Sequence, residues 1–104
     1  PVLGAGGGGY SGRAVHPVAV RAVFDVHAAL PELPIIGTGG VASGWDAAEL
    51  MLAGASAVQV GTATFADPKA PLTVLHELLA WCAHRGLTPS ALTGLAHRGG
   101  LARR

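Results

Sequence analysis

Two glycine-rich segments carry the residues best suited to chemistry. Gly37-Thr38-Gly39-Gly40 follows a short apolar segment, and Gly61-Thr62-Ala63 follows the next one. Glycine lets the backbone adopt left-handed angles and lets an anion approach the N–H groups, while threonine adds a hydroxyl donor. A helix beginning just after the first segment would add partial positive charge. Because the ends of adjacent parallel strands meet at one edge, the two segments together predict a phosphate site.

Neither segment matches a common nucleotide-binding motif. Neither is followed by Gly-Lys-Ser/Thr, as a P-loop would be, and neither contains the G-x-G-x-x-G of a dinucleotide fingerprint. For any one of these glycines alone, a tight turn is an equally good explanation. A third glycine-rich piece, residues 6–12, is long for such a turn and is typical of an active-site loop, with a linker as the alternative.

Short apolar segments alternate with longer helix-like ones, which predicts a strand–helix order repeated three times. The expected strands are residues 1–3, 33–36 and 57–60, and the expected helices are 18–30, 44–53, 69–85 and 87–95. Ser43 and Asp46 form an S-x-x-D capping pair, and Gly54 stands where the end of a helix favours glycine. The strands lack polar alternation, as parallel strands covered on both faces do.

This pattern leaves two α/β architectures open. Three parallel strands with their helices fit a small open sheet, and they also fit the C-terminal part of a (β/α)8 barrel, which has about 250 residues. The chain has 104 residues and starts with Pro1 rather than Met, which favours a piece of a longer barrel. We expect residues 1–97 to belong to the barrel domain and residues 98–104 to form a flexible tail.

The helix-like segment 69–85 has one apolar stripe. Its members recur at helical spacing: Leu72, Leu75, Leu78, Leu79 and Cys82. Cys82 has no neighbouring base in the sequence, so we interpret it as a buried structural thiol. A single cysteine excludes an internal disulfide and fits a reducing compartment, which predicts a cytoplasmic protein.

The acidic and histidine residues also have structural explanations. Asp46 is explained as a helix cap, and Glu49 as part of the solvated face of the same helix. His27, His76 and His84 have no spacing that brings two of them onto one helix face, so we expect no metal site.

The composition excludes further classes of partner. Charged residues make up 12% of the chain and the net charge is +1, so no basic face is available for nucleic acid. Apolar runs are interrupted by Gly, Pro, Asp or His before the ~20 residues that a membrane-spanning helix needs. We therefore expect neither nucleic acid nor a membrane as a partner.

Three blocks of the sequence point to one family. They are Gly9-Tyr10-Ser11-Gly12-Arg13-Ala14-Val15-His16-Pro17, Ile35-Ile36-Gly37-Thr38-Gly39-Gly40-Val41 and Ala53-Gly54-Ala55-Ser56-Ala57-Val58-Gln59-Val60-Gly61-Thr62-Ala63. In this order they resemble the C-terminal part of class 1 dihydroorotate dehydrogenases, over about residues 1–97. The resemblance implies an incomplete α/β chain supplying about strands 6 to 8 of a (β/α)8 (TIM) barrel that uses FMN to oxidise dihydroorotate to orotate in pyrimidine synthesis.

The resemblance also implies which residues contact the cofactor. Gly12 would lie against the flavin, and Gly39, Gly40, Gly61 and Thr62 would hold the FMN phosphate. No residue of this chain receives a catalytic role, because the family's catalytic Cys or Ser and its Lys and Asn contacts lie upstream. The 104 residues alone are therefore expected to be inactive.

Finer expectations concern the subclass and partners. The block Val58-Gln59-Val60-Gly61-Thr62-Ala63 resembles class 1 more than the membrane-attached class 2. We favour the NAD-linked form, which works with an iron-sulphur FAD electron-transfer subunit, and expect an oligomer when the enzyme is complete. The sequence departs from the family at His16, where Lys is more common before the proline. Alternatives are an FMN barrel similar to dihydropyrimidine dehydrogenase, and a non-catalytic remnant that binds phosphate or a partner.

Overall fold

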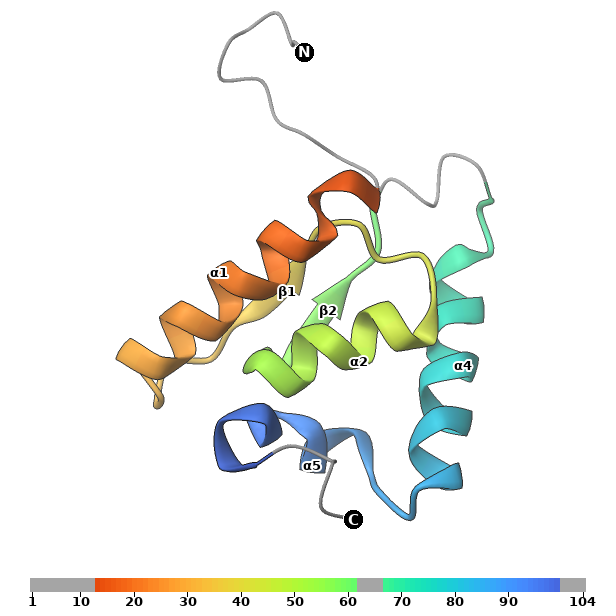
Figure 1. Cartoon of the computed structure of the whole chain (residues 1–104). Helices are drawn as coiled ribbons and strands as arrows, with labels where there is room; N and C mark the ends of the chain where they lie inside the picture. The colour runs from red at the N-terminus through yellow and green to blue at the C-terminus, as the bar shows by residue number, and fades with distance from the viewer. Residues whose placement is uncertain (1–12, 62–66, 100–104) are drawn as a thin grey trace, which may run out of the picture.

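A computed structural model of the chain describes residues 13–61 and 67–99, and its regular elements alternate between helix and strand (Figure 1). In order they are η1 (Arg13–Val15), α1 (His16–Ala29), β1 (Ile36–Thr38), α2 (Gly44–Ala53), β2 (Ala57–Gln59), α4 (Ala70–His84), α5 (Pro89–Leu92) and η2 (Leu95–Arg98). Strands β1 and β2 form a parallel pair in which Gly37 is opposite Val58. This confirms the α/β class, while the predicted strand at residues 1–3 lies outside the described residues.

Helix α2 lies at the centre of the packing. It contacts α1 on one side and α4 on the other, and it also packs on both strands. In Figure 1, α1 and α2 both lie in front of the sheet and α4 stands to one side. The residues buried in this core come mostly from α2 and its neighbours: Val23, Val41, Ala47, Ala48, Leu50, Met51, Ala53, Ala55, Val74, Leu78, Cys82 and Leu92.

The bounds of α2 agree with the prediction because both of its ends are set by local signals. The Ser43 hydroxyl accepts a hydrogen bond from the Asp46 N–H at 3.1 Å, as a helix cap does. At the other end Gly54 has φ of 139°, a conformation that residues with a side chain rarely adopt. The two signals fix the helix within the chain.

Helix α4 corrects the predicted apolar stripe. Its buried residues are Ala70, Val74, Leu78 and Cys82, which recur every four positions and face α2 and α5. The remaining members of the predicted stripe are exposed: Leu72 by 53%, Leu75 by 47% and Leu79 by 43%. A helix that packs against a narrow surface buries one row of side chains, so α4 buries fewer leucines than the prediction assigned to it.

Other element bounds shift for identifiable reasons. Strand β1 begins at Ile36 rather than residue 33, because the preceding segment forms a turn in which the Leu33 N–H bonds to the Leu30 carbonyl at 3.0 Å. Helix α1 begins at His16, two residues early, since Pro17 fits the first helical turn. The predicted helix at residues 87–95 is divided into α5 and η2 at Gly94, which has φ of 76°.

The C-terminal part of the chain also differs in detail from the prediction. Thr88 stands at the N-terminus of α5, but its hydroxyl contacts the Ser90 hydroxyl instead of capping the helix. Arg98 closes η2, and residues 100–104 of the expected tail lie outside the described residues. Within residues 13–61 and 67–99, no helix is both long enough and apolar enough to cross a membrane.

Candidate functional site

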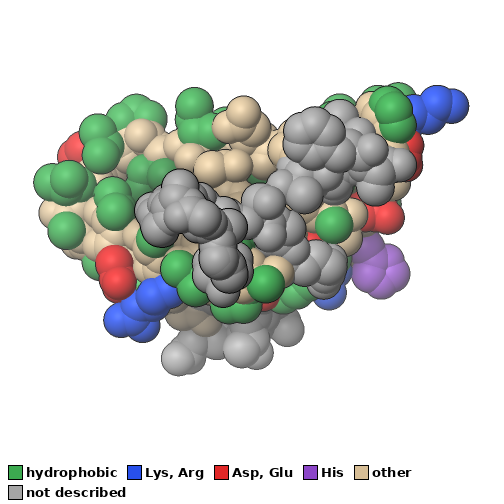
Figure 2. Space-filling model, turned by 90° about the horizontal axis from the view of Figure 1, so that it is seen from above, with side chains coloured by type: hydrophobic (Ala, Val, Ile, Leu, Met, Phe, Trp, Pro, Cys, Tyr) green, Lys and Arg blue, Asp and Glu red, His purple; other side chains and the backbone are tan. Residues whose placement is uncertain are grey.

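The two predicted glycine-rich segments meet at one edge of the sheet. Thr38, the last residue of β1, pairs with Gln59, the last residue of β2. Gly39 and Gly40 therefore leave one strand beside the point where Gly61 follows the other. Figure 2 looks down on the molecule from above, and among the described residues it shows Lys and Arg only in separate small groups on this face. The predicted convergence is confirmed, while Gly12 and Thr62 lie outside the described residues.

The three glycines at this edge are explained by different local surroundings. Gly39 has φ of 129°, and a Cβ there would lie 2.7 Å from the Ala19 Cβ, so the close approach of α1 already explains it. Gly40 has φ of 68°, and its N–H has no hydrogen-bond partner within the described ranges. Gly61 is exposed, and no described atom lies within 4 Å of a Cβ placed there. Gly40 and Gly61 therefore suit a ligand, whereas Gly39 suits packing.

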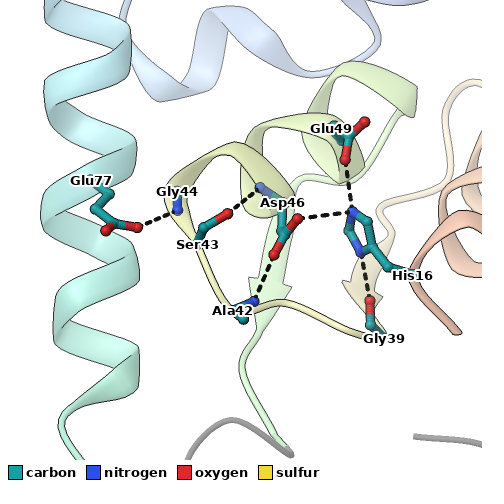
Figure 3. A network of polar contacts seen from close by, with 8 residues as sticks. All are labelled: His16, Gly39, Ala42, Ser43, Gly44, Asp46, Glu49 and Glu77. Atoms are coloured by element: carbon teal, nitrogen blue, oxygen red, sulfur yellow. Dashed lines mark hydrogen bonds and ion pairs between the residues drawn. The ribbon is translucent and has the colours of Figure 1, made fainter. Parts of the chain in front are cut away.

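The start of α2 is already occupied by carboxylates. The Gly44 N–H donates to Glu77 Oε1 on α4 at 2.7 Å, and the Ala42 N–H donates to Asp46 Oδ2 at 2.9 Å (Figure 3). The Asp46 N–H is satisfied by Ser43. This corrects the expectation that the helix end contributes free positive charge to an anion. Its amides instead join α2 to α4 and stabilise the loop before it.

A polar cluster missed in the sequence lies beside the Gly39-Gly40 turn. His16, at the start of α1, is 8% exposed, and its Nδ1 donates to the Gly39 carbonyl at 2.7 Å. Its Nε2 lies 2.9 Å from Glu49 Oε1 and 3.7 Å from Asp46 Oδ1 (Figure 3). Asp46 is 4% exposed. We call His16, Asp46 and Glu49 the His16 cluster.

The His16 cluster corrects one interpretation and extends another. Glu49 belongs to this cluster rather than to a solvated helix face. The cap of α2 is the Ser43 hydroxyl, while the Asp46 side chain accepts from the Ala42 N–H and lies beside His16. Both nitrogens of His16 already face oxygen atoms, so the geometry is that of a hydrogen-bonded cluster. The sequence separations of 23 and 33 residues hid these contacts from any local pattern. The unusual histidine before Pro17 was the available signal.

The other histidines either pack against neighbouring groups or lie exposed. His97 stacks on Phe24 with ring centroids 3.9 Å apart, and its Nε2 bonds to the Ala53 carbonyl at 2.8 Å. His97 therefore docks the end of the described chain onto α1 and α2. His27 lies beside His97, with centroids 4.7 Å apart, whereas His76 and His84 are exposed on α4.

Cys82 is structural, as the sequence predicted. It is 1% exposed on the buried row of α4. Burial raises the pKa of the thiol, and the nearby Arg85 charge offsets this in part. A thiol in such surroundings is a poor nucleophile at neutral pH.

Comparison with known proteins decides the family. A model described as "Dihydroorotate dehydrogenase" matches residues 1–81, most of the chain. The chain belongs to the dihydroorotate dehydrogenase family. It is 52% identical over 87 residues to a putative dihydroorotate dehydrogenase A (fumarate) of Solibacter usitatus, and 50% identical over 88 residues to the catalytic subunit of dihydroorotate dehydrogenase B (NAD(+)) of Geobacter metallireducens.

The shape of the chain agrees with this membership. A crystal structure of ligand-free DHODH from Eimeria tenella superimposes with a TM-score of 0.83 at 34% identity, covering 88% of this chain and 26% of that one. The Solibacter and Geobacter matches cover 84% and 85% of this chain but 28% of each relative. Further relatives named as B (NAD(+)) catalytic subunits, including one from Methanosarcina acetivorans at 62% identity over 65 residues, fit the expected class 1, NAD-linked subclass. The chain therefore spans less than a third of the length of these relatives.

Proposed function

We propose that this chain supplies the FMN phosphate-binding part of a class 1 dihydroorotate dehydrogenase. Family membership supports the activity, and the strand edge supports the cofactor. The observation that carries the proposal is the parallel pairing of β1 with β2 as far as Thr38 and Gln59, after which Gly40 and Gly61 follow at the same carboxyl edge of the sheet. Phosphates bind at this end of the strands in barrels of this kind.

The residues present fit a phosphate monoester. Gly40 offers an unpartnered N–H within the described part of the chain, and Gly61 leaves room for close approach of a ligand to the backbone. A backbone N–H bonded to a charged oxygen makes a stronger hydrogen bond than one bonded to a neutral acceptor. Thr62 and Gly12 complete the proposed set. Bound FMN would supply the hydride acceptor, while these residues hold and orient its phosphate.

The whole enzyme, in this proposal, oxidises dihydroorotate to orotate in the cytoplasm for pyrimidine synthesis. Residues 1–97 supply about strands 6 to 8 of its barrel, and residues 98–104 follow as a tail, except that Arg98 still belongs to η2. The relatives named B (NAD(+)), catalytic subunit, support NAD as the electron acceptor and a separate partner subunit. In this proposal that partner is an iron-sulphur FAD subunit, and the complete enzyme is an oligomer. The catalytic base would come from a part of the barrel that this chain does not contain.

A chimera tests the proposal, because the chain covers only part of its relatives. The chain replaces the matching segment of the Solibacter relative, with which it shares 52% identity over 87 residues. We expect a folded yellow protein that retains FMN and oxidises dihydroorotate. A monodisperse chimera with native circular dichroism but no bound flavin would contradict the proposal. The unaltered relative serves as the positive control.

Substitution of Gly40 tests the phosphate site itself. In the chimera, Gly40→Val should weaken FMN binding about tenfold or more, because the side chain blocks approach to the N–H and strains the turn. Gly86→Val is the matched control, since Gly86 has the same φ of 68° but follows α4. Equilibrium dialysis gives both dissociation constants. Equal FMN affinity of the two folded variants would show that Gly40 does not take part in binding the phosphate.

A further inference from the structure

One peptide group joins the His16 cluster to the proposed phosphate site. A trans peptide is planar, so its C=O and the N–H that follows point in opposite directions, and the described residues contain no cis peptide. The Gly39 carbonyl accepts a hydrogen bond from His16 Nδ1 at 2.7 Å (Figure 3). Fixing that carbonyl also fixes the Gly40 N–H and points it away from His16. This N–H is the proposed phosphate donor.

Oxygen atoms face both nitrogens of the His16 ring. Nδ1 faces a carbonyl, which accepts only, and Nε2 faces the carboxylates of Glu49 at 2.9 Å and Asp46 at 3.7 Å. Both carboxylates also accept when ionised, so only a ring with a proton on each nitrogen satisfies both sides. Asp46 and Glu49 are the charged groups facing the ring among the described residues.

We propose that doubly protonated His16, anchored on Glu49 and Asp46, holds the Gly39 carbonyl and so aims the Gly40 N–H at the cofactor phosphate. This inference rests on the proposed function. His16 acts through the loop and is a positioning residue, since its own ring nitrogens face Gly39 and the two carboxylates.

Loss of one ring proton breaks the arrangement. Whichever nitrogen loses it, a lone pair then faces an oxygen, and one of the two hydrogen bonds becomes a repulsive contact. Gly39 and Gly40 have no Cβ, so the freed peptide rotates at little cost and its N–H leaves the phosphate. Affinity for FMN should therefore fall as pH rises. A lysine at position 16 keeps its charge throughout this range.

The test compares FMN affinity across pH in the chimera with His16, His16→Lys and His16→Gln, using equilibrium dialysis. From about pH 6 to about pH 9 the His16 protein should lose affinity about tenfold relative to His16→Lys. The comparison with lysine cancels the titration of the phosphate itself. His16→Gln should bind weakly at every pH. His84→Gln, at an exposed position on α4, should match the unaltered chimera.

Two results would overturn the inference. One is equal pH dependence of FMN affinity in the His16 and His16→Lys proteins, a contrast that still decides the matter if His16→Gln does not fold. The other is nitrogen NMR of the imidazole showing a proton on one nitrogen only at about pH 6. A folded chimera that binds no FMN with His16 intact contradicts the proposed function instead. In that case, nitrogen NMR of the His16 ring still shows whether both ring nitrogens carry a proton, as the hydrogen bonds to Gly39 and Glu49 require.

Discussion

Helices α1 and α2 are joined at both ends by a histidine of α1, and the two joints differ. At the start of α1, His16 is surrounded by hydrogen-bond partners and carboxylates. Near the end of α1, His27 packs against Gly54 and the His97 ring, and its buried Nδ1 has no hydrogen-bond partner among the described residues. One joint depends on charge and direction, and the other on shape. The first should respond to protonation, and the second to volume.

The largest effect is expected from added volume at the His27 joint. Gly54→Ala places a Cβ 2.4 Å from the His27 Cβ, at φ of 139°. Overpacking and backbone strain together should lower the free energy of unfolding by roughly 3 kcal/mol. Urea denaturation followed by circular dichroism measures this.

Gly86→Ala is the control for this change. It also has a positive φ, 68°, but no described atom lies within 4 Å of the added Cβ. Strain alone should cost about 1 kcal/mol there. Equal destabilisation by Gly54→Ala and Gly86→Ala would show that shape does not govern the His27 joint.

A smaller effect is expected from a change of charge at the His16 joint. Asp46→Asn keeps the volume but replaces an oxygen facing the Ala42 N–H or His16 with an amide group. Loss of a charged hydrogen bond in a buried place should cost about 2 kcal/mol of unfolding free energy. Asp25→Asn is the control, because its pair with Arg21 is exposed and worth at most about 1 kcal/mol. Equal losses of unfolding free energy in Asp46→Asn and Asp25→Asn would show that the buried charges of the His16 joint add no more stability than an exposed ion pair.

The smallest effect is expected away from both joints, at Cys82 on the buried row of α4. Burial raises the pKa of the Cys82 thiol above its ordinary 9.0, so the folded chain holds this proton more tightly than the unfolded chain. The resulting stability is complete below pH 9.0 and is lost as pH rises through the raised value. Relative to Cys82→Ala, the unaltered chain should lose unfolding free energy only above that pH. Parallel curves of stability against pH would contradict this.

These differences show which features a sequence reveals. The bounds of α2 were predictable because Ser43, Asp46 and Gly54 act within a few residues of the helix ends. The strand edge was predictable because glycine-rich turns followed two apolar segments. The depth of burial along α4 was not, because Leu72, Leu75 and Leu79 fit the same helical period as the residues that actually face α2.

The His16 cluster marks the limit of that approach. Seen alone, Glu49 has the position of an exposed helix residue, and His16 is a histidine before a proline. Their contact depends on how α1 crosses α2, which the packing of Ala19 against Gly39 helps to set. Local spacing contains no information about that crossing. The resemblance to a family pointed to the glycines that we propose for the phosphate, but it marked His16 only as an exception.

The contact between Trp45 and Trp81 gives the molecule an internal optical probe. These two tryptophans, the only ones in the sequence, face each other across α2 and α4 with ring centroids 5.4 Å apart, and the Arg85 guanidinium lies 4.1 Å from the Trp81 ring. Their near-ultraviolet emission therefore originates almost entirely at one helix–helix seam. Opening of that seam would hydrate both indoles and move the emission to longer wavelength, even while each helix stays intact. Docking of α4 can thus be followed separately from helix formation without adding a label.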